Sequence, residues 1–203
     1  MKNKALTVAA LSLLTACAGF KPDYEVRDAS ASSKPAWTVQ SKTAKIDSSS
    51  ERKENRYFVA DAVNVDKGLC LRSAEVNATR KIASEVAQEI MGAFEENRKS
   101  ADDSANVKMK EKLEQNIQVN LHGVVVAEKY WERRAYMKAL GAEKDYTGYK
   151  CDVAVKIKKD ALIDALEMYK AKTMRTLKGE DKAAMGQAVD KTIDSLMKAE
   201  TNE

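Results

Sequence analysis

The clearest chemistry in this sequence lies at Leu14, Thr15, Ala16 and Cys17. These residues have the form of a bacterial lipobox, in which small residues fit the signal peptidase and the cysteine thiol receives a diacylglyceryl group before cleavage. Residues 1–16 read as a secretory signal, with a basic start and an apolar stretch too short to span a bilayer. We therefore expect a signal peptide at 1–16 and a mature lipoprotein that begins at Cys17, held in a membrane by palmitate-type acyl chains.

The residue after the anchor bears on which membrane holds the protein. Ala18 follows Cys17, whereas an Asp in that place usually retains lipoproteins at the inner membrane. This sorting pattern favours lipid anchoring at the outer membrane of a bacterial cell envelope, with the domain exposed to the periplasm or the cell surface. Loss of Lys2 and Lys4 with the signal lowers the formal charge from +4 to +2, which gives little reason to expect a polyanionic partner.

Cys70 and Cys151 remain once Cys17 is acylated, and such a pair in an oxidising compartment favours a disulfide. Cys70 begins a predicted helix and Cys151 lies on the core side of a predicted strand, so contact requires the helix to start above that strand. Closing a loop of about 80 residues would be worth roughly 4 kcal/mol in the chain-entropy model. Two buried free thiols are the alternative.

The chain offers little catalytic or metal-binding chemistry. His122 is the only histidine, and its place at a helix end suits a capping or surface role better than that of a general base. The adjacent carboxylates at 95–96 and 102–103 fall in hydrophilic breaks, where solvated carboxylates are ordinary. With one histidine and dispersed cysteines, we expect no metal site, no cofactor and no enzymatic activity.

The composition suits one modest domain with appendages. Of the 203 residues, 33% are charged and only 6% are aromatic, which argues against a large ligand-enclosing enzyme. Residues 17–55 are rich in Ser, Lys, Asp and Ala and lack apolar periodicity, so they predict a flexible tether. Trp37 interrupts it, and its indole either docks on the folded domain or rests at the lipid interface. Acidic and basic residues interleave throughout, so nucleic-acid binding is not expected.

The apolar pattern from Arg56 onward predicts an α+β domain over 56–160. Three strands are expected, at 56–65, 124–133 and 149–157. Two helices are expected, over 71–94 and 107–120. The first helix carries Ala74 and Ala78 on its buried side, where small residues let it lie flat on a sheet, and the last strand alternates as a sheet with one wet face requires. Residues 135–148 form either a hairpin loop or an extension of both flanking strands.

A C-terminal helical extension is expected over 161–203. It contains most of a helix over 159–177 and a second helix over 180–199, separated near Gly179. The last helix places an apolar stripe on one face, made of Met185, Val189, Ile193 and Leu196. Either this stripe packs back on the domain or it is an interaction surface that engages another subunit. The whole fold is thus expected to be a small antiparallel sheet of about three strands, a long Ala-rich helix packed on it, and C-terminal helices.

The order of these features matches a known pattern. A lipobox is followed by a polar tether with Pro35-Ala36-Trp37, a strand, and an Ala-rich helix that contains Ala74-Glu75-Val76-Asn77-Ala78. After it come a second helix, a Gly-Val-Val start to a strand ending in Tyr130 and Trp131, and a last strand over 149–155. This resembles the LPP-twenty family of small bacterial envelope lipoproteins, some of which are associated with flagellar outer-membrane structures. The resemblance covers roughly residues 35–165. It implies a helix on a small antiparallel sheet and no catalytic residues, although the family's turn between the last two strands is shorter than 135–148.

These features predict a lipid-anchored, non-catalytic interaction or assembly module at the outer membrane. Its partner would be another envelope protein or a second copy of the chain, contacted through an exposed sheet edge or through the C-terminal helices. The alternative is a binding protein that presents a pocket to peptidoglycan or to a small ligand.

Overall fold

A computed structural model describes residues 21–39, 46, 49–97 and 103–198; the expected signal peptide and Cys17 lie outside these residues. The strands are β1 (Tyr24–Ala29), β2 (Asn55–Asn64), β3 (Val125–Tyr136) and β4 (Tyr146–Lys158). The helices are α1 (Ser49–Glu54), α2 (Lys67–Glu96), α3 (Asp103–Asn120), α4 (Lys159–Thr173) and α5 (Gly179–Lys198). Two short 3-10 helices, η1 (Ala36–Thr38) and η3 (Lys138–Leu140), complete the described elements.

The four strands form one antiparallel sheet in the order β1-β3-β4-β2, so β1 and β2 are its edges. This confirms the expected α+β fold with a small antiparallel sheet, a long helix and C-terminal helices. The expected count of about three strands holds for β2, β3 and β4. The fourth strand, β1, comes from the segment that the sequence predicts to be a tether.

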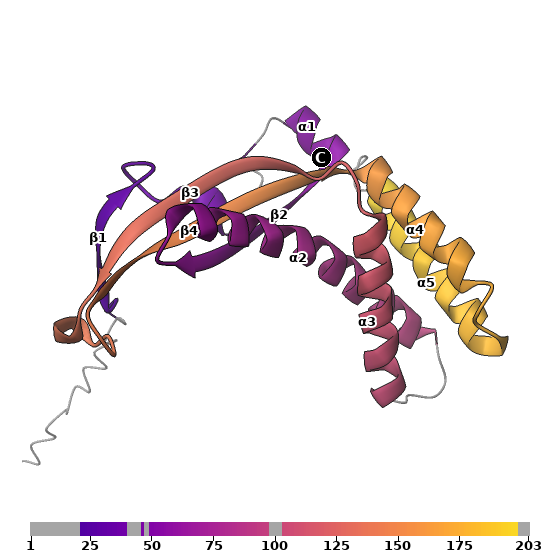
Figure 1. Ribbon diagram of the computed structural model, residues 1–203. Coiled ribbons are helices and arrows are strands. Elements are labelled where there is room, and N and C mark those ends of the chain that lie inside the picture. Colours follow the sequence, from indigo (N-terminus) through magenta and orange to yellow (C-terminus); the bar gives the residue numbers. More distant parts are fainter. Residues whose placement is uncertain (1–20, 40–45, 47–48, 98–102, 199–203) are drawn as a thin grey trace, which may run out of the picture.

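The long helix α2 lies against one face of the sheet (Figure 1). Asp66 caps its first turn, because its carboxylate accepts a hydrogen bond of 2.8 Å from the backbone N–H of Leu69. Ala74 and Ala78 are completely buried in this face, so the predicted close approach to the sheet is confirmed. Val153 and Val155 of β4 supply the opposing core side chains.

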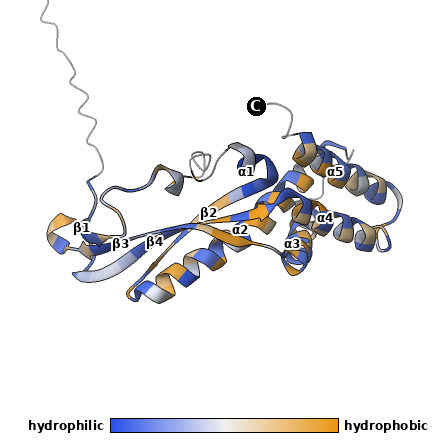
Figure 2. Ribbon diagram, turned by 90° about the horizontal axis from the view of Figure 1, so that it is seen from above, coloured by the Kyte–Doolittle hydropathy of each residue, from blue (hydrophilic) through white to orange (hydrophobic). Residues whose placement is uncertain are grey.

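The second half of α2 extends beyond the sheet toward the end of the molecule where α3, α4 and α5 lie (Figure 1). Contacts join α2 to α3 and to α5, and α4 to both α3 and α5. Figure 1 and Figure 2 place these helices at one end of an elongated molecule and the turn between β3 and β4 at the other end. No helix in the described part of the chain is long and apolar enough to cross a membrane.

Residues 135–148 are mainly an extension of both flanking strands, which settles one of the open alternatives. The pairing of β3 with β4 continues to Ala135 opposite Thr147 and Tyr136 opposite Tyr146. Only nine residues, 137–145, then close the turn, and η3 lies within them. The two strands therefore form a long hairpin that reaches away from the helices (Figure 1).

The expectation of a flexible tether over residues 17–55 is wrong for much of its described part. β1 pairs with β3 from Tyr24 opposite Tyr136 to Ala29 opposite Glu132, and residues 49–54 form α1. Four of the six residues of β1 are exposed, so the strand is held by its backbone pairing rather than by a buried apolar face. An edge strand of this kind leaves no apolar periodicity in the sequence, which explains why it reads as a linker.

Candidate functional site

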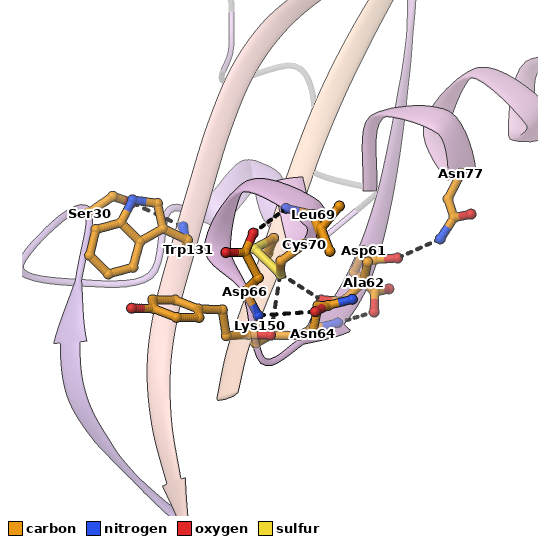
Figure 3. Close-up of a disulfide and its surroundings, with 12 residues drawn as sticks. Ser30, Asp61, Ala62, Asn64, Asp66, Leu69, Cys70, Asn77, Trp131 and Lys150 are labelled. Carbon is orange, nitrogen blue, oxygen red and sulfur yellow. Dashed lines mark hydrogen bonds and ion pairs between the residues drawn. A yellow bond between two sulfur atoms is a disulfide. The ribbon is translucent and has the colours of Figure 1, made fainter. Parts of the chain in front are cut away.

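The structure contains the expected disulfide between Cys70 and Cys151, whose Cα atoms lie 5.8 Å apart (Figure 3). The turn before α2 places Cys70. The side-chain oxygen of Asn64 accepts a hydrogen bond of 3.0 Å from the Asp66 backbone N–H, and Asp66 in turn caps the helix. The first turn of α2 is thereby held above the middle of β4. A disulfide between these cysteines requires the helix to start above this strand, and it does.

The expected interaction surface on the last helix is wrong. Met185 and Val189 are completely buried, and Ile193 and Leu196 are 9% and 5% exposed. All four belong to the main core cluster, where α5 packs against α2 and α4. The apolar stripe of α5 therefore serves the protein's own core, and the alternative in which the last helix packs back on the domain is correct.

The residues considered for catalysis take structural or surface positions. His122 is exposed, with its Nδ1 atom 3.1 Å from the carbonyl oxygen of Asn120. Glu95 accepts a hydrogen bond of 3.3 Å from Asn106, and Glu96 forms an ion pair of 2.6 Å with Lys191. Asp102 lies outside the described residues. Among the described residues, no three or more His, Cys, Asp or Glu side chains are grouped so that they could hold a metal ion.

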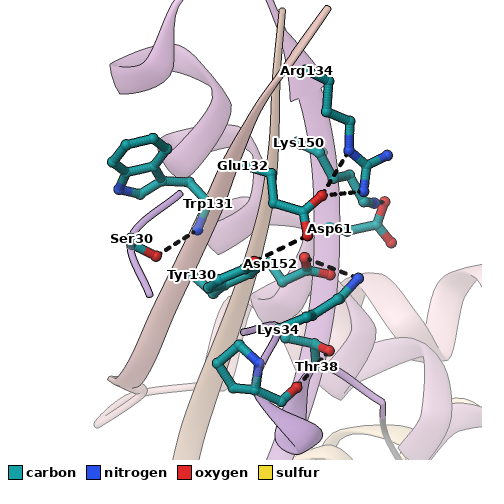
Figure 4. Close-up of polar contacts among 12 residues, drawn as sticks. Ser30, Lys34, Thr38, Asp61, Tyr130, Trp131, Glu132, Arg134, Lys150 and Asp152 are labelled. Atoms are coloured by element: carbon teal, nitrogen blue, oxygen red, sulfur yellow. Dashed lines mark hydrogen bonds and ion pairs between the residues drawn. The ribbon is translucent and has the colours of Figure 1, made fainter. Parts of the chain in front are cut away.

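The face of the sheet opposite α2 carries a polar cluster that the sequence analysis did not identify (Figure 4). The Tyr130 hydroxyl donates a hydrogen bond of 3.0 Å to Glu132, and the Arg134 guanidinium donates two bonds of 2.8 and 2.6 Å to the other carboxylate oxygen. Tyr130 and Glu132 are almost fully buried. Burial, followed by the hydrogen bond and the charge of Glu132, raises the pKa of Tyr130 to about 12, so its hydroxyl stays protonated.

Asp152 lies beside this cluster and is 4% exposed. Its Oδ2 atom is 3.6 Å from the Lys34 ammonium, and this buried oxygen has no hydrogen-bond partner among the described residues. Burial raises the pKa of the Asp152 carboxyl above its usual value, while the positive charges of Lys34 and Lys150 oppose that rise. Lys150 itself forms an ion pair with Asp61 of β2.

A strap from the N-terminal segment covers this face; we define it as residues 30–39. Its Trp37 is 7% exposed and packs in a second core cluster with Val59, Tyr130 and Ala154. Two places were expected for this indole, the folded domain and the lipid interface, and the structure shows it docked on the folded domain. The strap also explains why Asp152 and Ala154, on the face expected to be wet, are buried. The Pro35-Ala36-Trp37 sequence was the signal for this contact.

The two edges of the sheet differ. At β2, the side chains of α2 reach over the edge: Asn77 donates a hydrogen bond of 3.0 Å to the Asp61 carbonyl oxygen, and Lys81 donates one of 3.0 Å to that of Val59. β1 pairs with β3 on one side, and no other described strand lies against its opposite side. The edge of β2 is therefore covered by side chains of α2, whereas the outer edge of β1 is open as far as the described residues show.

A surface groove of about 630 Å³ lies between α2, α3 and β3. Its lining includes Leu71, Arg72, Glu75, Val76, Gln118 and Lys129. The Lys129 ammonium forms an ion pair of 3.2 Å with Glu75, so these two charges satisfy each other across the groove.

No known family profile and no curated protein matches this chain. Among solved structures, the secreted protein HP1454 from the human pathogen Helicobacter pylori is similar to this chain at 14% sequence identity, with a TM-score of 0.27. The alignment covers 73% of this chain and 54% of the HP1454 chain. The chain thus spans about half the length of that protein.

Proposed function

We propose that this protein is a lipid-anchored lipoprotein of the bacterial outer membrane whose domain is a non-catalytic assembly module. The outer edge of β1 is the surface through which it joins another envelope protein or a second copy of itself. The anchor is the diacylglyceryl group on Cys17, inferred from the lipobox at 14–17. The resemblance to the LPP-twenty envelope lipoproteins supports the same assignment, and we propose membership of that family on the order and spacing of the elements.

The observation that carries the assembly proposal is the contrast between the two edges of the sheet. An exposed strand edge is a template for pairing with another chain, and proteins that do not use an edge commonly cover it. Here α2 covers the edge of β2 through Asn77 and Lys81, while no described strand pairs with the outer side of β1, which is six residues long. With the stripe of α5 buried in the core, the sheet edge is the one of the two expected surfaces that is accessible.

The alternative, binding of peptidoglycan or a small ligand, would use one of the surface grooves. The paired charges of Glu75 and Lys129 in the groove between α2, α3 and β3 give no specific support to that alternative. We therefore propose assembly as the function.

The anchor is tested by substitution of one atom. Cys17→Ser removes the thiol that would be acylated, so the variant should take up no labelled palmitate and should leave the membrane pellet. A variant that still sediments with membranes, beside a wild type that takes up no label, would contradict lipid anchoring.

The edge is tested with two matched valines. Val26 on β1 and Val63 on β2 are each 51% exposed on edge strands. Val26→Lys places a charge on the open edge and should reduce the partner recovered from detergent-solubilised membranes, or the oligomer if the partner is a second copy. Val63→Lys places the same charge on the covered edge and should behave as the wild type. Equal recovery with both variants would contradict assembly through β1.

A further inference from the structure

The turn between β3 and β4 carries a compact group of aromatic side chains. We define the hairpin tip as residues 136–146 together with Tyr24, which lies beside them on β1. The rings of Tyr136 and Tyr146 are stacked, with centroids 4.4 Å apart and planes inclined by 4°, and the Tyr24 ring lies 5.5 Å from that of Tyr136. The Arg134 guanidinium covers the Tyr24 ring at 3.9 Å. Three tyrosines are thus gathered at the end of the molecule farthest from the helices (Figure 1).

The hairpin tip is held together by its own hydrogen bonds and exposes apolar surface. Asp145 accepts a bond of 2.7 Å from the Lys138 backbone N–H, and Gly141 adopts a φ of 107°, a conformation that favours glycine, where the turn closes. Leu140 is 41% exposed and Tyr146 is 39% exposed. The apex of the hairpin thus presents a leucine and a tyrosine beside the other two ring side chains of the tip.

The chain enters the fold at the hairpin tip. The backbone N–H of Met137 donates a hydrogen bond of 3.1 Å to the carbonyl oxygen of Asp23, which joins the entering chain to the turn. Lys21 comes four positions after Cys17, and a chain spans at most about 3.6 Å per residue. An anchored Cys17 is therefore within roughly 14 Å of Lys21, whatever path the chain takes.

We propose that the hairpin tip lies in the headgroup region of the bilayer that holds the acyl chains of Cys17. This inference rests on the proposed lipid anchor. Aromatic side chains with a polar end, such as tyrosine, are enriched where hydrocarbon meets water, and an exposed leucine beside them adds apolar area. The short link to the anchor delivers the tip to that region. The domain then stands on its hairpin with α3, α4 and α5 directed away from the membrane.

The charges of the hairpin tip indicate what kind of lipid surface it fits. Two exposed lysines, Lys138 and Lys144, are balanced by two exposed acids, Glu143 and Asp145. A tip without net charge gains little from anionic headgroups, whereas a polybasic segment gains about 1 kcal/mol for each Lys or Arg. The contact is therefore aromatic and apolar, and a neutral bilayer is sufficient for it.

A fluorescent probe at the tip tests this placement. In the lipidated full-length protein, Cys17 is acylated and Cys70 is bonded to Cys151, so Leu140→Cys introduces the one reactive thiol. Bimane attached there should be quenched by doxyl-labelled lipids in phosphatidylcholine vesicles. The matched control is Met168→Cys on α4, which is 53% exposed at the helical end. Quenching at position 140 should exceed that at position 168 several-fold.

The outcomes separate this inference from the anchor. Vesicle flotation of both labelled proteins, with quenching at position 140 no greater than at position 168, would overturn the hairpin placement and leave the lipid anchor intact. Failure of the wild type to float would overturn the anchor, and the placement with it. Replacing part of the phosphatidylcholine by phosphatidylglycerol should change the quenching little; a several-fold increase would contradict a contact without net charge. If Leu140→Cys fails to fold by circular dichroism, Lys144→Cys provides the second site on the same turn.

Discussion

The disulfide between Cys70 and Cys151 joins the first turn of α2 to the middle of β4, 81 residues away in the chain. It thus links the long helix to a central strand of the sheet on which the helix lies (Figure 3). The sheet is the element that carries both the open edge of β1 and the hairpin tip. A helix fixed at this point also keeps Asn77 and Lys81 over the edge of β2.

Removing this disulfide should lower stability strongly. The double variant Cys70→Ala, Cys151→Ala loses the constraint on a long loop of the unfolded chain, so we expect the free energy of unfolding to fall by about 4 kcal/mol. Urea unfolding of both proteins measures the difference. A reductant should destabilise the wild type and leave the double variant unchanged. If the reductant leaves the wild type as stable as before, the bond does not contribute as described.

Two methionines on α5 test whether its apolar stripe belongs to the core. Met185 is completely buried, so Met185→Ala should lower the free energy of unfolding by roughly 3 kcal/mol, the usual scale for a large side chain removed from a core. Met197 is 49% exposed on the same helix, and Met197→Ala should change stability by less than about 0.5 kcal/mol. Equal effects of the two substitutions on thermal or urea unfolding would contradict burial of the stripe in the core.

The burial of the Asp152 carboxyl should make the stability of the protein depend on pH. Burial raises the pKa of its carboxyl, so the folded protein holds this proton more tightly than the unfolded chain does. The contribution of this group to stability is therefore complete below the unfolded-state pKa and is lost as the pH rises through the folded-state pKa. The Oδ2 atom is buried without a hydrogen bond, so ionisation of this carboxyl is costly in the folded protein.

Asp152→Asn removes this ionisation. The variant should be more stable than the wild type at pH 7, and the difference should disappear as the pH falls to the ordinary range of a carboxyl group. Urea unfolding of both proteins across this range measures it. Asp164 is exposed on α4, so Asp164→Asn serves as the control that shows no such trend. A variant less stable than the wild type at pH 7 would mean that the Lys34 ion pair outweighs the burial of the charge.

Much of the core could be predicted from the sequence because it is periodic. The alternation of Val153 and Val155 and the three-to-four-residue spacing on α2 each describe one buried face, and both faces are where the patterns place them. The disulfide remained one of two alternatives, since pairing depends on where the helix starts relative to the strand. That position is set by the turn at Asn64 and Asp66, whose hydrogen bonds no periodicity records.

The features that could not be predicted from the sequence do not depend on a periodic pattern of apolar residues, or the pattern does not say what they face. β1 is an exposed edge strand held by backbone pairing, so its side chains carry no pattern. The polar cluster around Glu132 and Asp152 is buried because the strap covers it, a long-range contact signalled only by Trp37. The apolar stripe of α5 could be recognised in the sequence, but the spacing of its residues is the same whether the stripe faces the protein's own core or a partner.

Photo-crosslinking in intact membranes tests the central claim most directly. Benzoylphenylalanine would replace Val26 on the open edge of β1 or Val63 on the covered edge of β2, which are equally exposed. We predict an ultraviolet-dependent adduct from position 26 and little from position 63, with the adduct reduced when Cys17→Ser frees the protein from the membrane. No adduct from position 26, or the same adduct from both positions, would contradict a lipid-anchored module that assembles through β1.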